Sequence, residues 1–70
     1  MSEPVNLKKL RVLRGLGLAP AAEAIGVPRS VLYRAEIGEG TPHPKNAVKI
    51  AAFYGLEVLD VWPHLLSEAA

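Results

Sequence analysis

Leucines recur at every third position near the start of the chain, at Leu7, Leu10 and Leu13, with basic residues between them. Apolar residues spaced three or four positions apart are typical of one face of an amphipathic α-helix. Asn6 stands directly before the first leucine, and its side chain is suited to cap the N-terminus of a helix. The pattern therefore predicts a helix over about residues 6–14.

Two further apolar patterns follow, and a glycine ends each of them. The first consists of Ala21, Ala22, Ala24 and Ile25, ends at Gly26 and predicts a helix over residues 18–25. The second consists of Val31, Leu32 and Ala35, ends at Gly38 and predicts a helix over residues 29–36. This third helix keeps four polar residues on its outer face, namely Arg29, Ser30, Tyr33 and Arg34.

The remaining chain predicts two more helices and a tail. Pro44 suits a first helical position and Gly55 a helix end, so residues 44–54 form the fourth helix. Its inward face consists of Ala47, Val48, Ile50, Ala51 and Tyr54. Val58, Val61 and Trp62 predict a short helix over residues 57–62, and Pro63 ends it before a tail over residues 63–70. Since no strand pattern occurs, the predicted fold is all-α with five helices.

Composition supports one small domain over residues 1–70. The chain has 70 residues and no cysteine, and 50% of its residues are hydrophobic, so helix packing or self-association must supply the stability that disulfides cannot. A chain of this size has little room for a catalytic cleft, which argues against an enzyme. No apolar run is long enough to span a bilayer, and residues 1–4 do not resemble a signal peptide. We therefore expect a cytoplasmic protein without a membrane partner.

Charge is distributed unevenly along the chain. Residues 1–37 hold six basic and three acidic residues, whereas residues 38–70 hold two basic and four acidic residues. Any polyanion is thus expected to meet the N-terminal half. His43 and His64 are the only histidines, and without cysteine or a metal-ligand spacing they predict no metal site. No motif indicates a cofactor or a small-molecule ligand.

The order of these elements predicts a helix-turn-helix over residues 18–36, since two short helices joined by a glycine-containing turn form that motif. Residues 7–62 resemble the Cro and lambda-repressor-like family of DNA-binding regulators. The resemblance is carried by Leu7-Lys-Lys-Leu-Arg-Val-Leu-Arg-Gly-Leu, Ala22-Glu-Ala-Ile-Gly-Val, Arg29-Ser-Val-Leu-Tyr-Arg-Ala-Glu-Ile-Gly, Thr41-Pro and Val48-Lys-Ile-Ala-Ala-Phe-Tyr-Gly-Leu. It implies a compact five-helix domain that binds double-stranded DNA.

By this resemblance, the helix over residues 29–36 is the recognition helix. Arg29, Ser30 and Arg34 occupy the positions that meet base edges, and an arginine fork suits guanine O6 and N7. Contacts to the DNA backbone fall to five other residues, which are Leu18, Tyr33, Thr41, His43 and Lys45. The alternative is that the two arginines are solvated charges on a surface helix.

The chain also departs from the family pattern. Gly17 and Leu18 replace a common Thr or Ser cap and a glutamine that touches DNA, and Glu39 lies in a loop that is often basic. These changes predict modest affinity. Arg11 and Glu36 occupy positions that form an ion pair between the first and third helices in family members, and we expect that pair here, with a structural role.

The leading prediction is a sequence-specific regulator, most simply a repressor that binds a two-fold operator as a homodimer. Val58, Trp62, Leu65 and Leu66 are predicted to form the dimer interface, because four helices cover only part of that apolar face. The alternative for Trp62 is that it fills the core of its own chain. The alternative function is a protein-binding module, for example one that binds a toxin or the transcription machinery.

Overall fold

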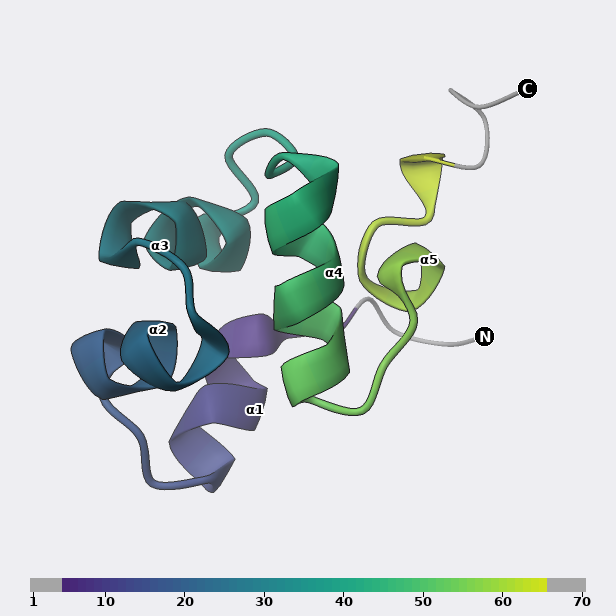
Figure 1. Cartoon of the computed structure of the whole chain (residues 1–70). Helices are drawn as coiled ribbons and strands as arrows, with labels where there is room; N and C mark the ends of the chain where they lie inside the picture. Colours follow the sequence, from purple (N-terminus) through teal and green to yellow (C-terminus); the bar gives the residue numbers. More distant parts are fainter. Residues whose placement is uncertain (1–4, 66–70) are drawn as a thin grey trace.

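The computed structural model describes residues 5–65 and confirms the predicted all-α fold of five helices. The helices are α1 (Leu7–Leu13), α2 (Leu18–Ile25), α3 (Arg29–Ile37), α4 (Pro44–Phe53) and α5 (Val58–Val61). Each predicted helix end lies within one residue of the observed end. Figure 1 shows α2 and α3 to one side of α4, α1 below them, and α5 on the other side of α4.

Local capping explains where these helices begin and end. The Asn6 side chain accepts a hydrogen bond from the backbone N–H of Lys9 at 2.9 Å, as the N-cap prediction requires. Glu57 and Asp60 form a capping box at the start of α5. Within the predicted tail, His64 and Leu65 also have helical backbone conformation.

The core forms where the five helices meet. Leu32 of α3 and Ile50 of α4 are fully buried at its centre, and small alanines from three helices let the backbones approach closely. The buried cluster comprises Leu7, Ala21, Ala22, Val27, Leu32, Ala35, Ala47, Ile50, Tyr54 and Trp62. In residues 5–65 every helix is too short to cross a bilayer.

Two positions assigned to inward faces are exposed instead. Leu13 is 73% exposed and Val48 is 57% exposed. A helix turns by about 100° per residue, so Leu13 lies about 240° from Leu7, whereas Arg11 lies only about 40° from it. The buried face of α1 therefore includes Arg11 in place of Leu13. On α4, Val48 likewise lies about 100° from Ala47 and falls outside the buried stripe.

Candidate nucleic-acid interface

The outer face of α3 carries the four polar residues that the sequence placed there. Arg29, Ser30, Tyr33 and Arg34 are exposed, while Leu32 is buried on the opposite side of the helix. Within the described residues, neither arginine side chain forms a hydrogen bond or an ion pair. The face is therefore free to contact a ligand outside the chain.

The turn between α2 and α3 sets the direction of this face. Gly26 has φ +91°, a left-handed conformation that other residues adopt only at a cost. The amides of Gly26 and Val27 both donate to the Ala22 carbonyl, at 2.9 and 3.1 Å, which closes the end of α2. Val27 is buried, so the turn is also fixed to the core before Pro28 starts α3.

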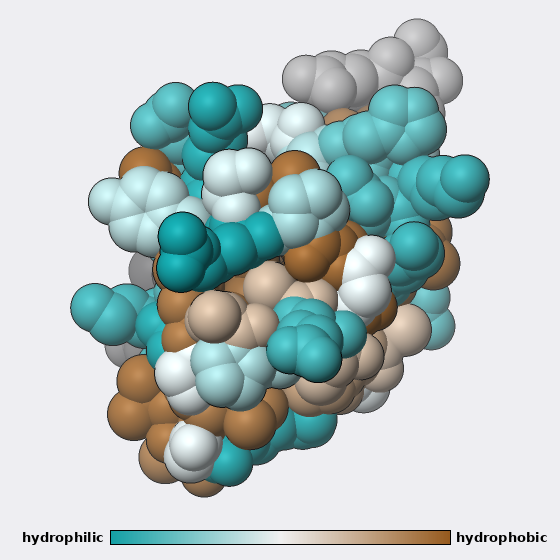
Figure 2. Space-filling view, turned by 60° about the vertical axis from the view of Figure 1, so that its left-hand side comes forward, coloured by the Kyte–Doolittle hydropathy of each residue, from teal (hydrophilic) through white to brown (hydrophobic). Residues whose placement is uncertain are grey.

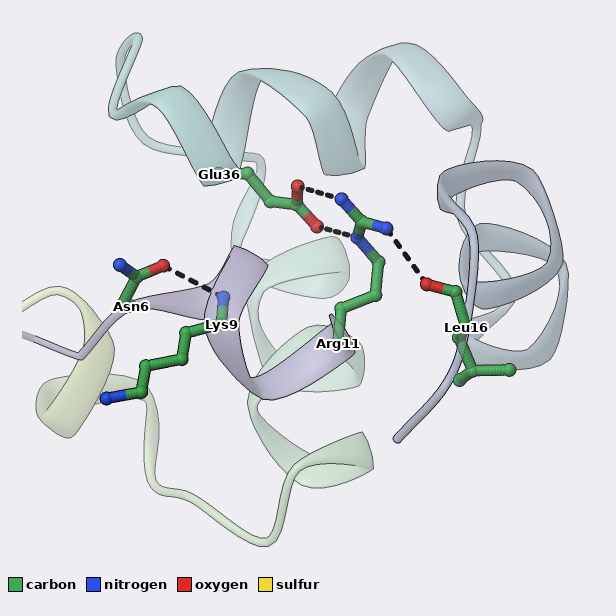
Figure 3. A network of polar contacts seen from close by, with 5 residues as sticks. All are labelled: Asn6, Lys9, Arg11, Leu16 and Glu36. Carbon is green, nitrogen blue, oxygen red and sulfur yellow. Dashed lines mark hydrogen bonds and ion pairs between the residues drawn. The ribbon is translucent and has the colours of Figure 1, made fainter. Parts of the chain in front are cut away.

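Arg11 joins α3 to α1 and to the chain that leads into α2. Its Nε donates to Glu36 Oε2 at 2.7 Å and its Nη2 to Oε1 at 3.0 Å, forming a two-point ion pair. Its Nη1 donates to the Leu16 carbonyl at 2.9 Å (Figure 3). The hydrogen bond to Glu36 raises the pKa of the Arg11 guanidinium above its ordinary value.

This ion pair is the one that the family resemblance implied, and its burial decides its character. The side chains of Arg11 and Glu36 are only 11% and 4% exposed. Charges removed from water in this way hold a defined geometry, and the loss of either partner strands the other. The pair therefore fixes the orientation of α3 and does not contact a ligand.

Backbone amides at helix starts can bind phosphate. The helices differ in whether these amides already have a hydrogen-bond partner. At the start of α2, Gly17 provides no side-chain cap, and the amides of Leu18 and Ala19 donate to no other described residue. The apolar Leu18 side chain packs against the core. The group that Leu18 can offer to a phosphate is its backbone N–H. Leu18 can thus serve the DNA backbone only through its main chain.

The amides at the start of α4 are already used. Pro44 has no N–H, and His43 accepts from the next three residues: its Nδ1 from Lys45 at 3.1 Å, and its carbonyl from Asn46 at 2.8 Å and Ala47 at 2.9 Å. Because Nδ1 is an acceptor, Nε2 carries the proton of the neutral ring. His43 is therefore first a capping residue, which leaves Nε2–H as the donor for a phosphate.

Thr41 and Lys45 differ in their availability. The Thr41 hydroxyl lies 2.7 Å from His64 Nε2. Where Nε2–H donates this bond, the hydroxyl keeps its own proton for a phosphate, and where the hydroxyl donates it, that proton is already used. Lys45 is exposed, and its ammonium has no partner among the described residues. Of the predicted backbone contacts in this region, Lys45 is the one whose side chain has no hydrogen bond or ion pair among the described residues.

A depression of about 280 Å³ separates α3 from the start of α4, and Arg34, Thr41 and His43 line it together. Two further polar residues line it, Glu39 and Asn46. Asn46 was not among the predicted site residues. It lines the same depression as Arg34, although the two residues lie on different helices.

Other basic residues of the N-terminal half serve the fold. Arg14 Nη1 donates to the Phe53 carbonyl at 2.9 Å, and its guanidinium carbon lies 5.1 Å from the ring centres of both Phe53 and Tyr54. The charge of Arg11 is paired with Glu36, whereas Arg14 stays exposed and keeps its charge. In Figure 2, hydrophilic side chains gather over the upper half of the face, at the level of α3 and the start of α4.

Comparison with known proteins agrees with this architecture. A family model described as helix-turn-helix matches residues 7–61. The chain belongs to the helix-turn-helix family. This helix-turn-helix protein is 35% identical over 57 residues to an uncharacterised HTH-type transcriptional regulator of Methanocaldococcus jannaschii. The matched stretch covers 81% of this chain and 86% of that protein. No solved structure matches the chain.

The predicted dimer residues of this helix-turn-helix protein do not form one exposed face. Trp62 is 6% exposed and belongs to the same buried cluster as Leu7 and Ala35, so it fills the core of its own chain. This corrects its assignment to a dimer interface. Val58 and Leu65 are half-buried, and Leu66 lies outside the described residues.

Proposed function

We propose that the chain is a sequence-specific regulator that binds duplex DNA with α3 in the major groove. The observation that carries this proposal is the exposed outer face of α3, where Arg29 and Arg34 have no partner within the described chain. The relative from Methanocaldococcus jannaschii is named as a transcriptional regulator, which supports the same role. The protein acts by binding and not by catalysis.

Each exposed group has a distinct task in this proposal. Arg29 and Arg34 read guanine through their paired N–H donors, and Ser30 adapts to a neighbouring base. Tyr33, His43 and Lys45 contact phosphate or sugar, with the Leu18 amide at the other edge of the site. Thr41 joins them when its hydroxyl accepts from His64 Nε2–H and donates its own proton to a phosphate. These backbone contacts set the register of α3 in the groove.

We propose further that the protein is a cytoplasmic repressor that binds a two-fold operator as a homodimer. One recognition helix reads only a few base pairs, and a two-fold pair reads two half-sites about 34–36 Å apart. With Trp62 buried, the contact between the two chains rests on Val58 and Leu65. A repressor of this kind blocks transcription by occupying the operator.

The test is a titration of the protein against duplex DNA across a salt series, followed by two substitutions. A DNA-binding protein must show log affinity that falls with log salt concentration. Arg34→Ala is expected to cost about 1–3 kcal/mol on a selected site and far less on random duplex. Lys45→Ala, the matched control, is expected to weaken both complexes alike. Salt-independent or absent binding would favour the protein-binding alternative, and an equal loss on both DNAs for Arg34→Ala would remove its base-reading role.

A further inference from the structure

Exposed apolar side chains gather on two surfaces away from α3. Among residues 5–65, Val12 and Leu13 on α1 are 57% and 73% exposed, and Val48 and Leu59 near α5 are 57% and 46% exposed. Isolated exposed apolar residues are ordinary, but apolar patches rimmed by polar residues mark interaction surfaces. Each of these two pairs lies beside charged residues of one sign.

The first surface is the outer face of α1, here the α1 ridge, which consists of Lys8, Lys9, Val12 and Leu13. At about 100° per residue these four side chains fall within an arc of about 140°, opposite Leu7. All four are exposed, and neither lysine forms an ion pair with a described residue. The ridge is therefore apolar and basic.

The second surface is a groove of about 600 Å³ between α4 and α5, here the α4–α5 groove. Its walls are mainly apolar, and Glu57 and Asp60 stand at its edge. The apolar lining includes Val48, Ala52, Leu56, Val58 and Leu59. The two carboxylates accept backbone N–H groups of the capping box but have no basic partner in the part of the chain that the structure describes. The groove is therefore apolar and acidic.

We propose that the α1 ridge of one copy docks in the α4–α5 groove of a second copy. The surfaces match in apolar character, and the two lysines of the ridge face the two carboxylates of the groove. No residue of α1 lines the groove of its own chain, and the exposed ridge side chains point away from the buried Leu7. The contact is therefore intermolecular and joins two different surfaces.

When two copies join through unlike surfaces, one ridge and one groove stay free in the pair. Further copies can then join in the same way, which gives a head-to-tail assembly. The outer face of α3 belongs to neither surface and stays accessible. Val58 also belongs to the proposed two-fold contact, so the two modes of association compete for α5. Head-to-tail contact thus holds copies together without using the two-fold dimer.

The experiment measures sedimentation without DNA in a Leu65→Asp background, which removes the two-fold contact. The background protein is expected to associate beyond a dimer as its concentration rises. Leu13→Asp, which disables the ridge, and Val48→Asp, which disables the groove, should each be monomeric. An equal mixture of the two should form a complex of two chains and stop there, because one intact ridge meets one intact groove. Both sites are exposed, and thermal unfolding of each variant, with Leu13→Ser and Val48→Ser as milder replacements, checks that folding is retained.

A charge test separates complementarity from general stickiness. Lys8→Glu with Lys9→Glu is expected to weaken association by about tenfold or more. Arg29→Glu with Arg34→Glu changes the net charge equally on α3 and should leave association unchanged while DNA binding is lost. A background protein that stays monomeric at millimolar concentration, or a mixture that forms no two-chain complex, would overturn the proposal. Either result would leave the proposal of DNA binding standing, because that proposal is tested separately by the loss of DNA binding in the α3 variant.

Discussion

Three polar side chains lie inside an otherwise apolar interior, and they behave differently. Arg11 and Glu36 satisfy one another through two hydrogen bonds, whereas the buried Tyr54 hydroxyl has no partner among the described residues. Burial raises the pKa of Tyr54, and the negative charge of Glu36 raises it further, while Arg11 and Arg14 oppose the shift. Breaking the satisfied Arg11–Glu36 pair is therefore expected to lower the free energy of unfolding strongly. Removing the unsatisfied Tyr54 hydroxyl is expected to change it little.

Removing the Tyr54 hydroxyl is expected to be harmless at neutral pH. A buried donor without a partner carries a desolvation penalty, so Tyr54→Phe should leave the free energy of unfolding unchanged or raise it by about 1 kcal/mol. Because the folded pKa lies above the unfolded value of about 10, the folded state favours the neutral phenol, and the wild type loses stability as pH rises through the folded pKa. Urea unfolding at neutral and alkaline pH should show this added alkaline loss in the wild type and not in Tyr54→Phe.

Breaking the Arg11 and Glu36 pair from one side should be far more damaging than removing both charges. Arg11→Met leaves the Glu36 carboxylate buried and unpaired, at an expected cost of about 3–5 kcal/mol. Adding Glu36→Met removes that stranded charge and should restore most of the loss. Chemical denaturation of both single variants and the double variant forms the cycle that measures this. Additive losses would show that the two side chains act independently.

At the scale of elements, glycines serve two different purposes around α2. Gly26 ends the helix with φ +91°, whereas Gly17 begins it with φ −73° in extended conformation. A side chain added at Gly26 meets open space but must adopt a left-handed backbone. A Cβ at Gly17 meets only ordinary contacts, at 3.6 Å from Pro20. The same substitution should therefore have opposite effects at the two ends of one helix.

Gly26→Ser is expected to destabilise the protein by about 1–2 kcal/mol, since it forces an L-residue into the left-handed region. Gly17→Ser should stabilise it by a few tenths of a kcal/mol, because serine supplies the missing cap to the first turn of α2. Thermal unfolding of the two variants side by side measures both signs. A loss of stability in Gly17→Ser would show that the start of α2 cannot accept a side-chain cap.

At the scale of the whole molecule, function depends on what the fold leaves exposed. The fold buries Arg11 in its ion pair with Glu36 and leaves Arg29, Arg34 and Lys45 exposed. Apolar residues outside the core lie mainly on the α1 ridge and the α4–α5 groove. The molecule therefore presents the polar face that we propose for DNA and the apolar faces that we propose for other copies.

We expect two chains to bind each two-fold operator. Leu65→Asp places a charge in the proposed two-fold contact and should reduce the complex to one chain on one half-site, with a corresponding loss of affinity. Sedimentation of the protein with a single operator counts the chains directly. Leu59→Asp, on the groove side of α5, is the matched control and should keep two chains on the operator. A wild-type complex of one chain per operator would contradict the two-fold arrangement.

The sequence alone determined the helices, their ends and the helix-turn-helix at their centre. These features depend on signals that act over a few residues: the Asn6 cap, the left-handed glycine at position 26 and the apolar spacing of α3. The exposed reading face of α3 follows from the same spacing, since Leu32 and Ala35 must turn inward. The family resemblance also added the pairing of Arg11 with Glu36, which no local pattern requires.

Only the tertiary structure decided which apolar faces are covered and which polar groups are already used. The outward turn of Leu13 follows from helical rotation alone, but an apolar face near the C-terminus did not show that Trp62 fills the core of its own chain. The use of His43 as the cap of α4 and the bond between Thr41 and His64 were equally hidden. Burial and hydrogen bonding depend on neighbours that are distant along the chain, so packing of the five helices determines them and local sequence does not.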